Sequence, residues 1–357
     1  INLPQIIVFY FLFANLVFAQ DLVSIDKGQS KSKQKVYLEI DKKISETKKI
    51  LPNSPITVIT TADSLLDVSY DLNYYSGKTN SLKLLSYAYE AMENYESSLS
   101  YLFRALELDL ASGDPEAICF SYNSIGILYL KIGEYKSAKK YLLIALEICE
   151  KNENLKIAPQ IYNSLASCYQ ETSEFDKAEE NFTKALFLLE QRKDSTAISR
   201  VLNNLGFLKE NSGNYKAATD YYQKALNIKR RLGKPIDIAN TLQNLANTYI
   251  SLSQVDKALP LLNESIVIAK SINHTRLLAD GYRLLTYSYY FKRDAALSQK
   301  YSKLYDEANR TIDNIDRAQK ISELKVKYES DTKKKENEYL IRKNKLPDFV
   351  VDYLWKS

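Results

Sequence analysis

Hydrophobic and small residues recur along this chain with a period of 40. A leucine or isoleucine followed by a small residue occurs at Leu85-Ser86, Ile125-Gly126, Leu165-Ala166, Leu205-Gly206, Leu245-Ala246 and Leu285-Thr286. Twelve residues after the small position in the first five units stand Ser98, Ala138, Ala178, Ala218 and Ala258, and seven further on stand Ala105, Ala145, Ala185, Ala225 and Ser265. A period held through five steps indicates an internal repeat, in which small residues recur where backbones must pack closely.

Within each unit the apolar residues are spaced as on one face of an α-helix. Leu242, Leu245, Ala246 and Tyr249 stand at i, i+3, i+4 and i+7, which predicts a buried stripe. We expect each unit to form a two-helix hairpin that stacks on the next. The starts of the first helices are predicted at residues that are also 40 apart and mostly suit an N-cap: Asp114, Asn154, Asp194, Lys234 and His274. The pattern predicts an all-α fold of about six units and twelve helices.

The middle units carry the marker residues of a known repeat. The segment contains Gly126-x-x-Tyr129, then Gly133-Glu-Tyr135-x-x-Ala138, then Ala145-Leu-Glu147. On these residues the sequence resembles the tetratricopeptide repeat family over about residues 72–309, although its period is 40 rather than roughly 34 and its last unit is weakened. The resemblance implies a right-handed α-solenoid of helical hairpins.

The segments outside the repeats have different characters. Residues 1–19, with the apolar run Ile6–Val17 before Ala19, are predicted to be a signal peptide, because a membrane span takes about 20 apolar residues; an uncleaved anchor stays open. Residues 20–71 are predicted to hold a degenerate helical pair, Val36–Leu51 and Ile56–Asn73. The solenoid follows over 72–310, a charged helix over 311–345 and an irregular tail over 346–357.

The charged helix carries a short apolar seam among Lys and Glu residues, which is typical of a coiled coil. Its pattern, Ile321-Ser-Glu-Leu-x-x-Lys-Tyr328-Glu, resembles the linker of exported bacterial repeat proteins. In those proteins the linker joins a tetratricopeptide sensor to a transmembrane span and a histidine kinase or DNA-binding output domain. Pro347 and the following tail do not continue this plan. A genuine stop, a frameshift and a truncated sequence stay open, as do self-association through this helix and, for a truncated sequence, a membrane tether.

Polar side chains recur at the position three residues before each small residue of the first helices. The resemblance places first helices on the concave face, where an extended peptide would find a ladder of amides that donate and accept hydrogen bonds. The expected peptide- or partner-binding residues are Lys83, Asn123, Asn163, Asn203, Asn204, Gln243, Asn244, Asn247, Arg283 and Tyr287. Tyr87, Phe207 and Tyr290 are aromatic neighbours. An alternative stays open, in which the asparagines tie neighbouring helices together. Four tyrosines outside the marker positions are further interface candidates: Tyr74, Tyr75, Tyr221 and Tyr222.

Charge argues against nucleic-acid binding by the repeats. The formal charge is +5, but residues 27–49 hold eight basic and three acidic residues, and residues 317–345 hold ten and five. These flanks together carry +10, which leaves −5 for the rest of the chain. A basic footprint on the repeat body is therefore not predicted.

Candidate chemistry is sparse. The single histidine, His274, falls at a predicted cap, and no two glycines have the spacing of a nucleotide-binding loop. We therefore expect no catalytic residues, no metal and no cofactor. Cys119, Cys149 and Cys168 each fall inside a helical pattern, which predicts small buried residues. A Cys119–Cys149 bridge stays open, because the start of one helix lies near the end of its antiparallel partner.

These observations predict a non-catalytic, exported scaffold that binds a protein or peptide, periplasmic or membrane-associated in a Gram-negative-type bacterium. The alternative hypothesis is the sensory region of a truncated signal-transduction receptor, such as a repeat-containing histidine kinase or transcriptional regulator. Repeat folds serve many functions, so the sequence does not identify the partner.

Overall fold

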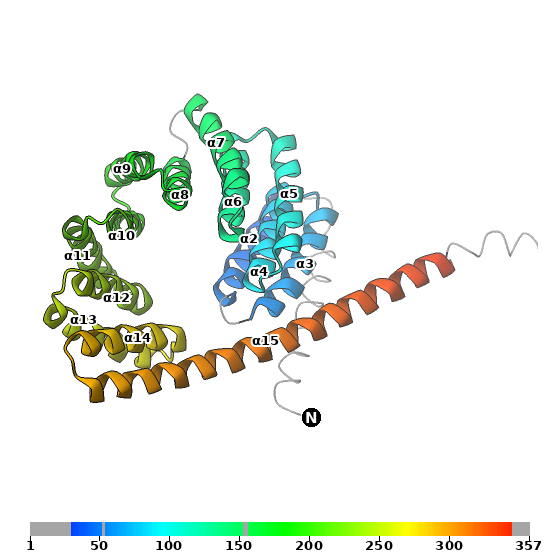
Figure 1. Cartoon of the computed structure of the whole chain (residues 1–357). Helices are drawn as coiled ribbons and strands as arrows, with labels where there is room; N and C mark the ends of the chain where they lie inside the picture. The colour runs from blue at the N-terminus through cyan, green and yellow to red at the C-terminus, as the bar shows by residue number, and fades with distance from the viewer. Residues whose placement is uncertain (1–29, 52–53, 153–155, 345–357) are drawn as a thin grey trace, which may run out of the picture. The chain divides into compact units, whose positions relative to one another are not determined.

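The computed structural model describes residues 30–51, 54–152 and 156–344, with side chains over 33–318 outside these gaps and at 320 and 321. The described residues form fourteen helices and no strand (Figure 1). The helices are α2 (Ser30–Ile50), α3 (Pro55–Asp71), α4 (Tyr75–Ala91), α5 (Tyr95–Ser112), α6 (Pro115–Ile132), α7 (Tyr135–Lys151), α8 (Ala158–Glu171), α9 (Phe175–Gln191), α10 (Ser195–Asn211), α11 (Tyr215–Leu232), α12 (Pro235–Ser251), α13 (Val255–Ser271), α14 (Thr275–Phe291) and α15 (Ala295–Asn344). They fall into two compact units, one ending at Thr311 and the other beginning at Ile312.

Consecutive helices pack as hairpins, and each hairpin packs on the next. The most extensive packing within the repeats joins α4 to α5, α6 to α7, α8 to α9, α10 to α11 and α12 to α13. The second helix of each pair then contacts the first helix of the following pair, from α5 on α6 to α13 on α14. The α-solenoid predicted from the 40-residue period is confirmed, and α2 and α3 precede it, with α3 packed more extensively on α4 than on α2.

Two of the small positions explain how the helices of a hairpin approach each other. A Cβ added to Gly126 would lie 2.6 Å from Cγ of Leu142, and one added to Gly206 would lie 2.7 Å from the ring of Tyr222. Tyr222 is completely buried there. Our suggestion that Tyr222 suits an exposed interface is therefore wrong, because the volume left free at Gly206 receives its ring.

From Asn73 onward, the described turns fall at intervals of 20 residues, outside the undescribed residues 153–155, and each has one residue in the left-handed conformation. A Schellman pattern closes the helix before several of them, as where the N–H of Glu134 donates to the carbonyl of Tyr129 and that of Gly133 to Leu130. The left-handed residues are Asn73, Glu93, Gly113, Gly133, Ser173, Lys193, Gly213, Gly233, Ser253, Asn273 and Arg293. Most are not glycine, so the hairpin geometry overrides the local cost of that conformation.

The predicted caps are confirmed at three first helices. Asp114 accepts from the N–H of Glu116, Asp194 from that of Ala197, and Nδ1 of His274 from that of Leu277. Lys234 occupies the N-cap position of α12, but its side chain makes no capping hydrogen bond.

The predicted start of α8, the first helix of the third repeat, is wrong. Asn154 lies outside the described residues, and α8 begins only at Ala158, with Pro159 in its first turn. Proline is favoured in a helix's first turn, since farther in it removes a hydrogen bond and clashes with the preceding turn. Pro159 therefore delays the start of α8 relative to the period.

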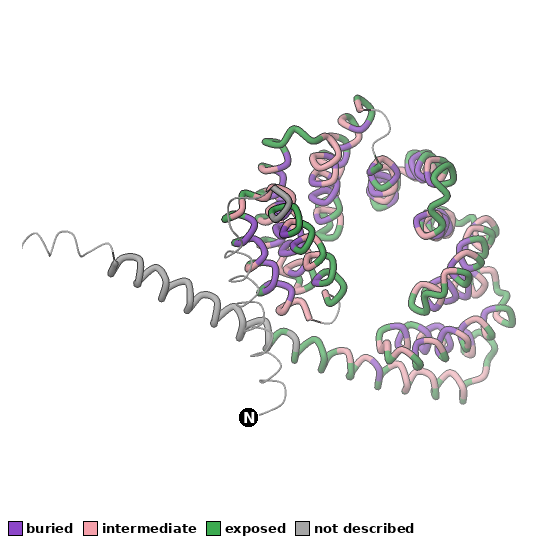
Figure 2. The backbone as a smooth tube through the Cα atoms, turned by 180° about the vertical axis from the view of Figure 1, so that it is seen from behind, coloured by how far each residue is buried: buried purple, intermediate pink, exposed green. Residues whose placement is uncertain are grey.

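The hydrophobic core continues from one repeat to the next between the two layers of helices (Figure 2). One cluster joins four successive helices through Leu142, Leu165, Phe182 and Leu205. Burial is therefore shared between neighbours, as a stacked repeat requires. No helix in the described ranges is long and apolar enough to cross a membrane. The proposed signal peptide and the C-terminal tail lie outside those ranges.

Candidate functional site

The first helices of successive units contact one another directly. Contacts join α6 to α8, α8 to α10, α10 to α12 and α12 to α14. In Figure 1, α8, α10, α12 and α14 follow one side of the row, and α9, α11 and α13 follow the other. We call the surface formed by the accessible side chains of α8, α10, α12 and α14 the first-helix face. Because it is continuous over four units, it can follow a ligand of extended shape.

A ladder of asparagine amides crosses this face from helix to helix. Nδ2 of Asn204 on α10 donates to Oδ1 of Asn163 on α8 at 3.0 Å, and Nδ2 of Asn244 on α12 lies 3.5 Å from Oδ1 of Asn203 on α10. The four side chains are half-buried. Each contact uses one atom of each amide, so the asparagines both tie neighbouring helices together and keep hydrogen-bonding capacity toward the surface.

Glu210 on α10 extends the ladder and was not anticipated from the sequence. Its Oε1 accepts from Nδ2 of Asn247 at 2.6 Å and its Oε2 from the hydroxyl of Tyr222 at 2.9 Å. Burial, with the carboxylate of Glu210 beside it, raises the pKa of Tyr222. Glu210 therefore joins the surface ladder to the core. In the sequence it is marked only by being a polar residue seven positions after Asn203.

Three of the predicted binding residues point inward. Lys83 is buried and forms an ion pair of 2.8 Å with the fully buried Asp109 on α5. Gln243 is buried and donates from Nε2 to the carbonyl of Leu277 at 2.8 Å. Asn123 is also buried, and its Oδ1 has no hydrogen-bond partner among the described residues. At these three units the position predicted to line the groove serves the packing between repeats.

A second buried lysine lies directly beneath Asn203. Nζ of Lys229 on α11 donates to Oγ1 of Thr241 at 2.7 Å and lies 3.5 Å from Oδ1 of Asn203. Burial lowers the pKa of Lys229, since the charged form loses its hydration. This lysine was missed because it falls on a second helix, whose polar residues the sequence pattern assigns to solvent.

Aromatic side chains are accessible on the first-helix face. Phe207 exposes 44% of its surface, Tyr287 exposes 50% and Tyr290 exposes 70%. Arg283, on α14 with Tyr287 and Tyr290, forms a loose ion pair of 3.7 Å with Asp280. Tyr87, much earlier in the chain on α4, is half-buried and lies under Nζ of Lys48. The accessible rings and the amides together offer the two kinds of contact that an extended peptide needs.

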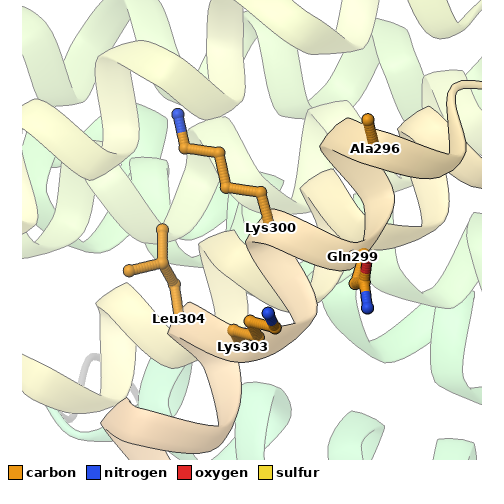
Figure 3. A pocket seen from close by; sticks show the side chains of 5 residues that line it. All are labelled: Ala296, Gln299, Lys300, Lys303 and Leu304. Carbon is orange, nitrogen blue, oxygen red and sulfur yellow. The ribbon is translucent and has the colours of Figure 1, made fainter.

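A depression of about 360 Å³ lies on α15. Its lining residues all come from that one helix, as Figure 3 shows: Ala296, Gln299, Lys300, Lys303 and Leu304. Ligand pockets form where several elements converge on a concave site. The depression therefore does not have the construction of an enclosed ligand site. Among the described side chains, no group of three or more His, Cys, Asp or Glu is placed to hold a metal ion.

The fold and its first-helix face define a helical-hairpin repeat protein of the kind that presents a continuous surface to other chains. Models described as tetratricopeptide repeat match residues 81–116, 121–152 and 157–271, which together span just over half of the chain. The protein belongs to the tetratricopeptide repeat family. A comparison with curated proteins finds no match.

Several solved structures share this architecture. A Rap protein complexed with Competence and Sporulation Factor aligns with TM-score 0.59 and 17% identity, covering 94% of this chain and 98% of its own. BtubC (BKLC) from P. vanneervenii aligns with TM-score 0.56 and 21% identity, covering 62% and 93%. NprR in complex with its cognate peptide NprX aligns with TM-score 0.52 and 17% identity, covering 81% and 87%. At these identities the likeness establishes the fold.

Proposed function

We propose that this protein is a non-catalytic scaffold that binds a peptide, or an extended segment of a partner protein, along the first-helix face. The observation that carries the proposal is the two amide pairs that bridge successive first helices, Asn163–Asn204 and Asn203–Asn244, together with the accessible rings of Phe207 and Tyr287. Amides can pair with the main chain of an extended peptide, and rings can contact its side chains. One of the similar structures, NprR, was solved in complex with its cognate peptide NprX, and a Rap protein was solved complexed with Competence and Sporulation Factor, which supports this proposal.

The chain offers a matched pair of phenylalanines for the test. Phe207 lies on first helix α10 with 44% of its surface exposed, and Phe187 lies on second helix α9 with 59% exposed. Peptides would be selected from a displayed random library on the purified chain, and their affinity measured by fluorescence anisotropy. We expect Phe207→Ala to weaken binding about tenfold, the loss of one aromatic anchor, and Phe187→Ala to leave it unchanged. Equal effects of both substitutions would contradict the proposed face.

We include export in the proposal, on the basis of the apolar run Ile6–Val17 followed by Ala19. A cleaved signal peptide would leave a mature chain beginning at Gln20. The test expresses the full chain in a Gram-negative host and determines the N-terminus of the protein in the periplasmic fraction. A chain that keeps residues 1–19 and stays in the cytoplasm would contradict export without affecting the binding proposal.

A second candidate function is ligand sensing coupled to an output region. One feature favours it: α15 is a single 50-residue helix that begins against the last repeat, where Tyr301 stacks on Tyr289, and continues past Thr311. A continuous helix can transmit a change at the repeats only if its own state differs with ligand. Hydrogen exchange of residues 312–344 with and without a selected peptide tests this. Identical exchange rates with and without the peptide would contradict the sensing function and leave the scaffold function as the only proposal.

A further inference from the structure

Two cysteines of one hairpin lie together at its open end. Cys119 is in the second turn of α6 and Cys149 is in the last turn of α7. Both belong to one buried cluster with Ala145, Ile157 and Ile161, and both are free thiols. Because the two helices are antiparallel, the start of α6 meets the end of α7. The juxtaposition therefore follows from the fold and does not depend on one side-chain rotamer.

The contacts of Cys119 place its sulfur against α7. Its Sγ donates to the carbonyl of Ala145, one turn before Cys149, at 3.5 Å, and the two thiols are close enough to shift each other's pKa. Cys119 is completely buried, whereas Cys149 exposes 7% of its surface. The third thiol, Cys168, lies in a different cluster on α8, where its Sγ lies 3.6 Å from the carbonyl of Tyr135.

The two thiols differ in character as well as in access. The interaction with Cys119 lowers the pKa of Cys149, and the nearby Arg192 acts in the same direction, against the effects of burial and of Glu116. The same interaction, together with burial, raises the pKa of Cys119. The thiolate is the reactive form of cysteine in exchange with a disulfide. Cys149 is therefore the member of the pair suited to attack first.

We propose that Cys119 and Cys149 form a thiol–disulfide modification site, which an external disulfide oxidises to an intramolecular bond between α6 and α7. The thiolate of Cys149 attacks one sulfur of the oxidant, breaks its S–S bond and leaves a mixed disulfide at Cys149. Cys119 then loses its proton and attacks Sγ of Cys149, releasing the second half of the oxidant as a thiolate. The pair gives up two electrons and two protons, and the oxidant becomes two thiols. This inference is independent of the proposed peptide-binding function.

The consequence is local to one junction of the solenoid. The bond ties the ends of a hairpin whose buried cluster includes Ile157 and Ile161, before and within α8. Closing the loop from 119 to 149 restricts the unfolded chain. Oxidation is therefore expected to raise the midpoint of thermal unfolding and to slow proteolysis of α6 and α7.

The test uses the purified full chain in buffers of reduced and oxidised glutathione. Free thiols are alkylated after quenching, and peptides are mapped by mass spectrometry. We expect two thiols to disappear together, a peptide linking Cys119 to Cys149, and an alkylated Cys168. Three free thiols in the most oxidising buffer, a linked peptide that contains Cys168, or a bond between two chains would overturn the proposal.

Single substitutions test the order of attack, with Cys168→Ser as the control. Cys119→Ser should retain glutathione on Cys149, because no second thiol displaces it. Cys149→Ser should leave Cys119 unmodified, and Cys168→Ser should form the same intramolecular bond as the natural chain. Glutathione on Cys119 but not on Cys149 would contradict the assigned order. The thiol count of the unsubstituted chain decides the pairing itself, whether or not the variants fold.

Discussion

Two junctions three repeat periods apart use the same three positions in different ways. At the first, Lys83 on α4 pairs with Asp109 on α5, and Oγ of Ser121 on α6 donates to the same carboxylate. At the second, the corresponding residues are Asn203 on α10, Lys229 on α11 and Thr241 on α12, joined by hydrogen bonds. The first junction buries a compensated ion pair, and the second buries a lysine with neutral partners.

This difference shows what the repeat fixes and what it leaves free. The period fixes three side chains at each boundary between units, one from each of three successive helices. It does not fix their chemistry, since the second-helix position holds Asp109, Cys149, Leu189, Lys229 and Ala269 in turn, all buried. Each boundary must therefore satisfy its own polar groups, and neighbouring boundaries should respond differently to substitution.

The largest effect is expected from Asp109→Ala. The substitution leaves Lys83 buried without its carboxylate, and breaking a buried pair by removing one partner costs about 3 to 5 kcal/mol. Urea unfolding followed by circular dichroism measures the loss. The double variant Lys83→Met/Asp109→Leu removes both charges and should recover most of the stability. A single variant with nearly natural stability would show that this ion pair does not stabilise its junction.

A smaller and pH-dependent effect is expected from Lys229→Met. Among the described residues no carboxylate forms an ion pair with Lys229, so removing its charge should change stability at neutral pH by less than about 2 kcal/mol. The folded-state pKa lies below the ordinary value of 10.5, so the unfolded chain holds the proton to higher pH. Stability of the natural chain relative to this variant should therefore rise as pH approaches 10.5. Unfolding midpoints of both proteins across this range measure the difference, and a constant difference would contradict the assignment.

The smallest effect concerns the turns, where the same backbone again carries different residues. Ser173 has φ of 59° and Gly133, one period earlier, has φ of 85°. Because a left-handed conformation suits glycine, Ser173→Gly should stabilise the protein by about 0.5 to 1 kcal/mol, and Gly133→Ala should destabilise it by a similar amount. Thermal unfolding of the two variants measures both changes. Stabilisation by Gly133→Ala would contradict this account of the turns.

The helical pairs were predictable because small residues and helix caps repeat at fixed spacing. The cap at His274 and the close approach at Gly126 follow from local pattern alone. The start of α8 was not predicted, because Pro159 takes precedence over the period there. The burial of each predicted groove residue was also not predictable, since Lys83 is buried against Asp109 and Gln243 is buried against the carbonyl of Leu277. These partners lie 26 and 34 residues away, and no local pattern reports them.

The central claim is that the first-helix face binds an extended peptide. Hydrogen–deuterium exchange of the full chain, with and without a peptide selected on it, tests this claim most directly. The account predicts slower exchange in α8, α10, α12 and α14 on binding, and unchanged exchange in α9, α11 and α13. Protection confined to the second helices would contradict it.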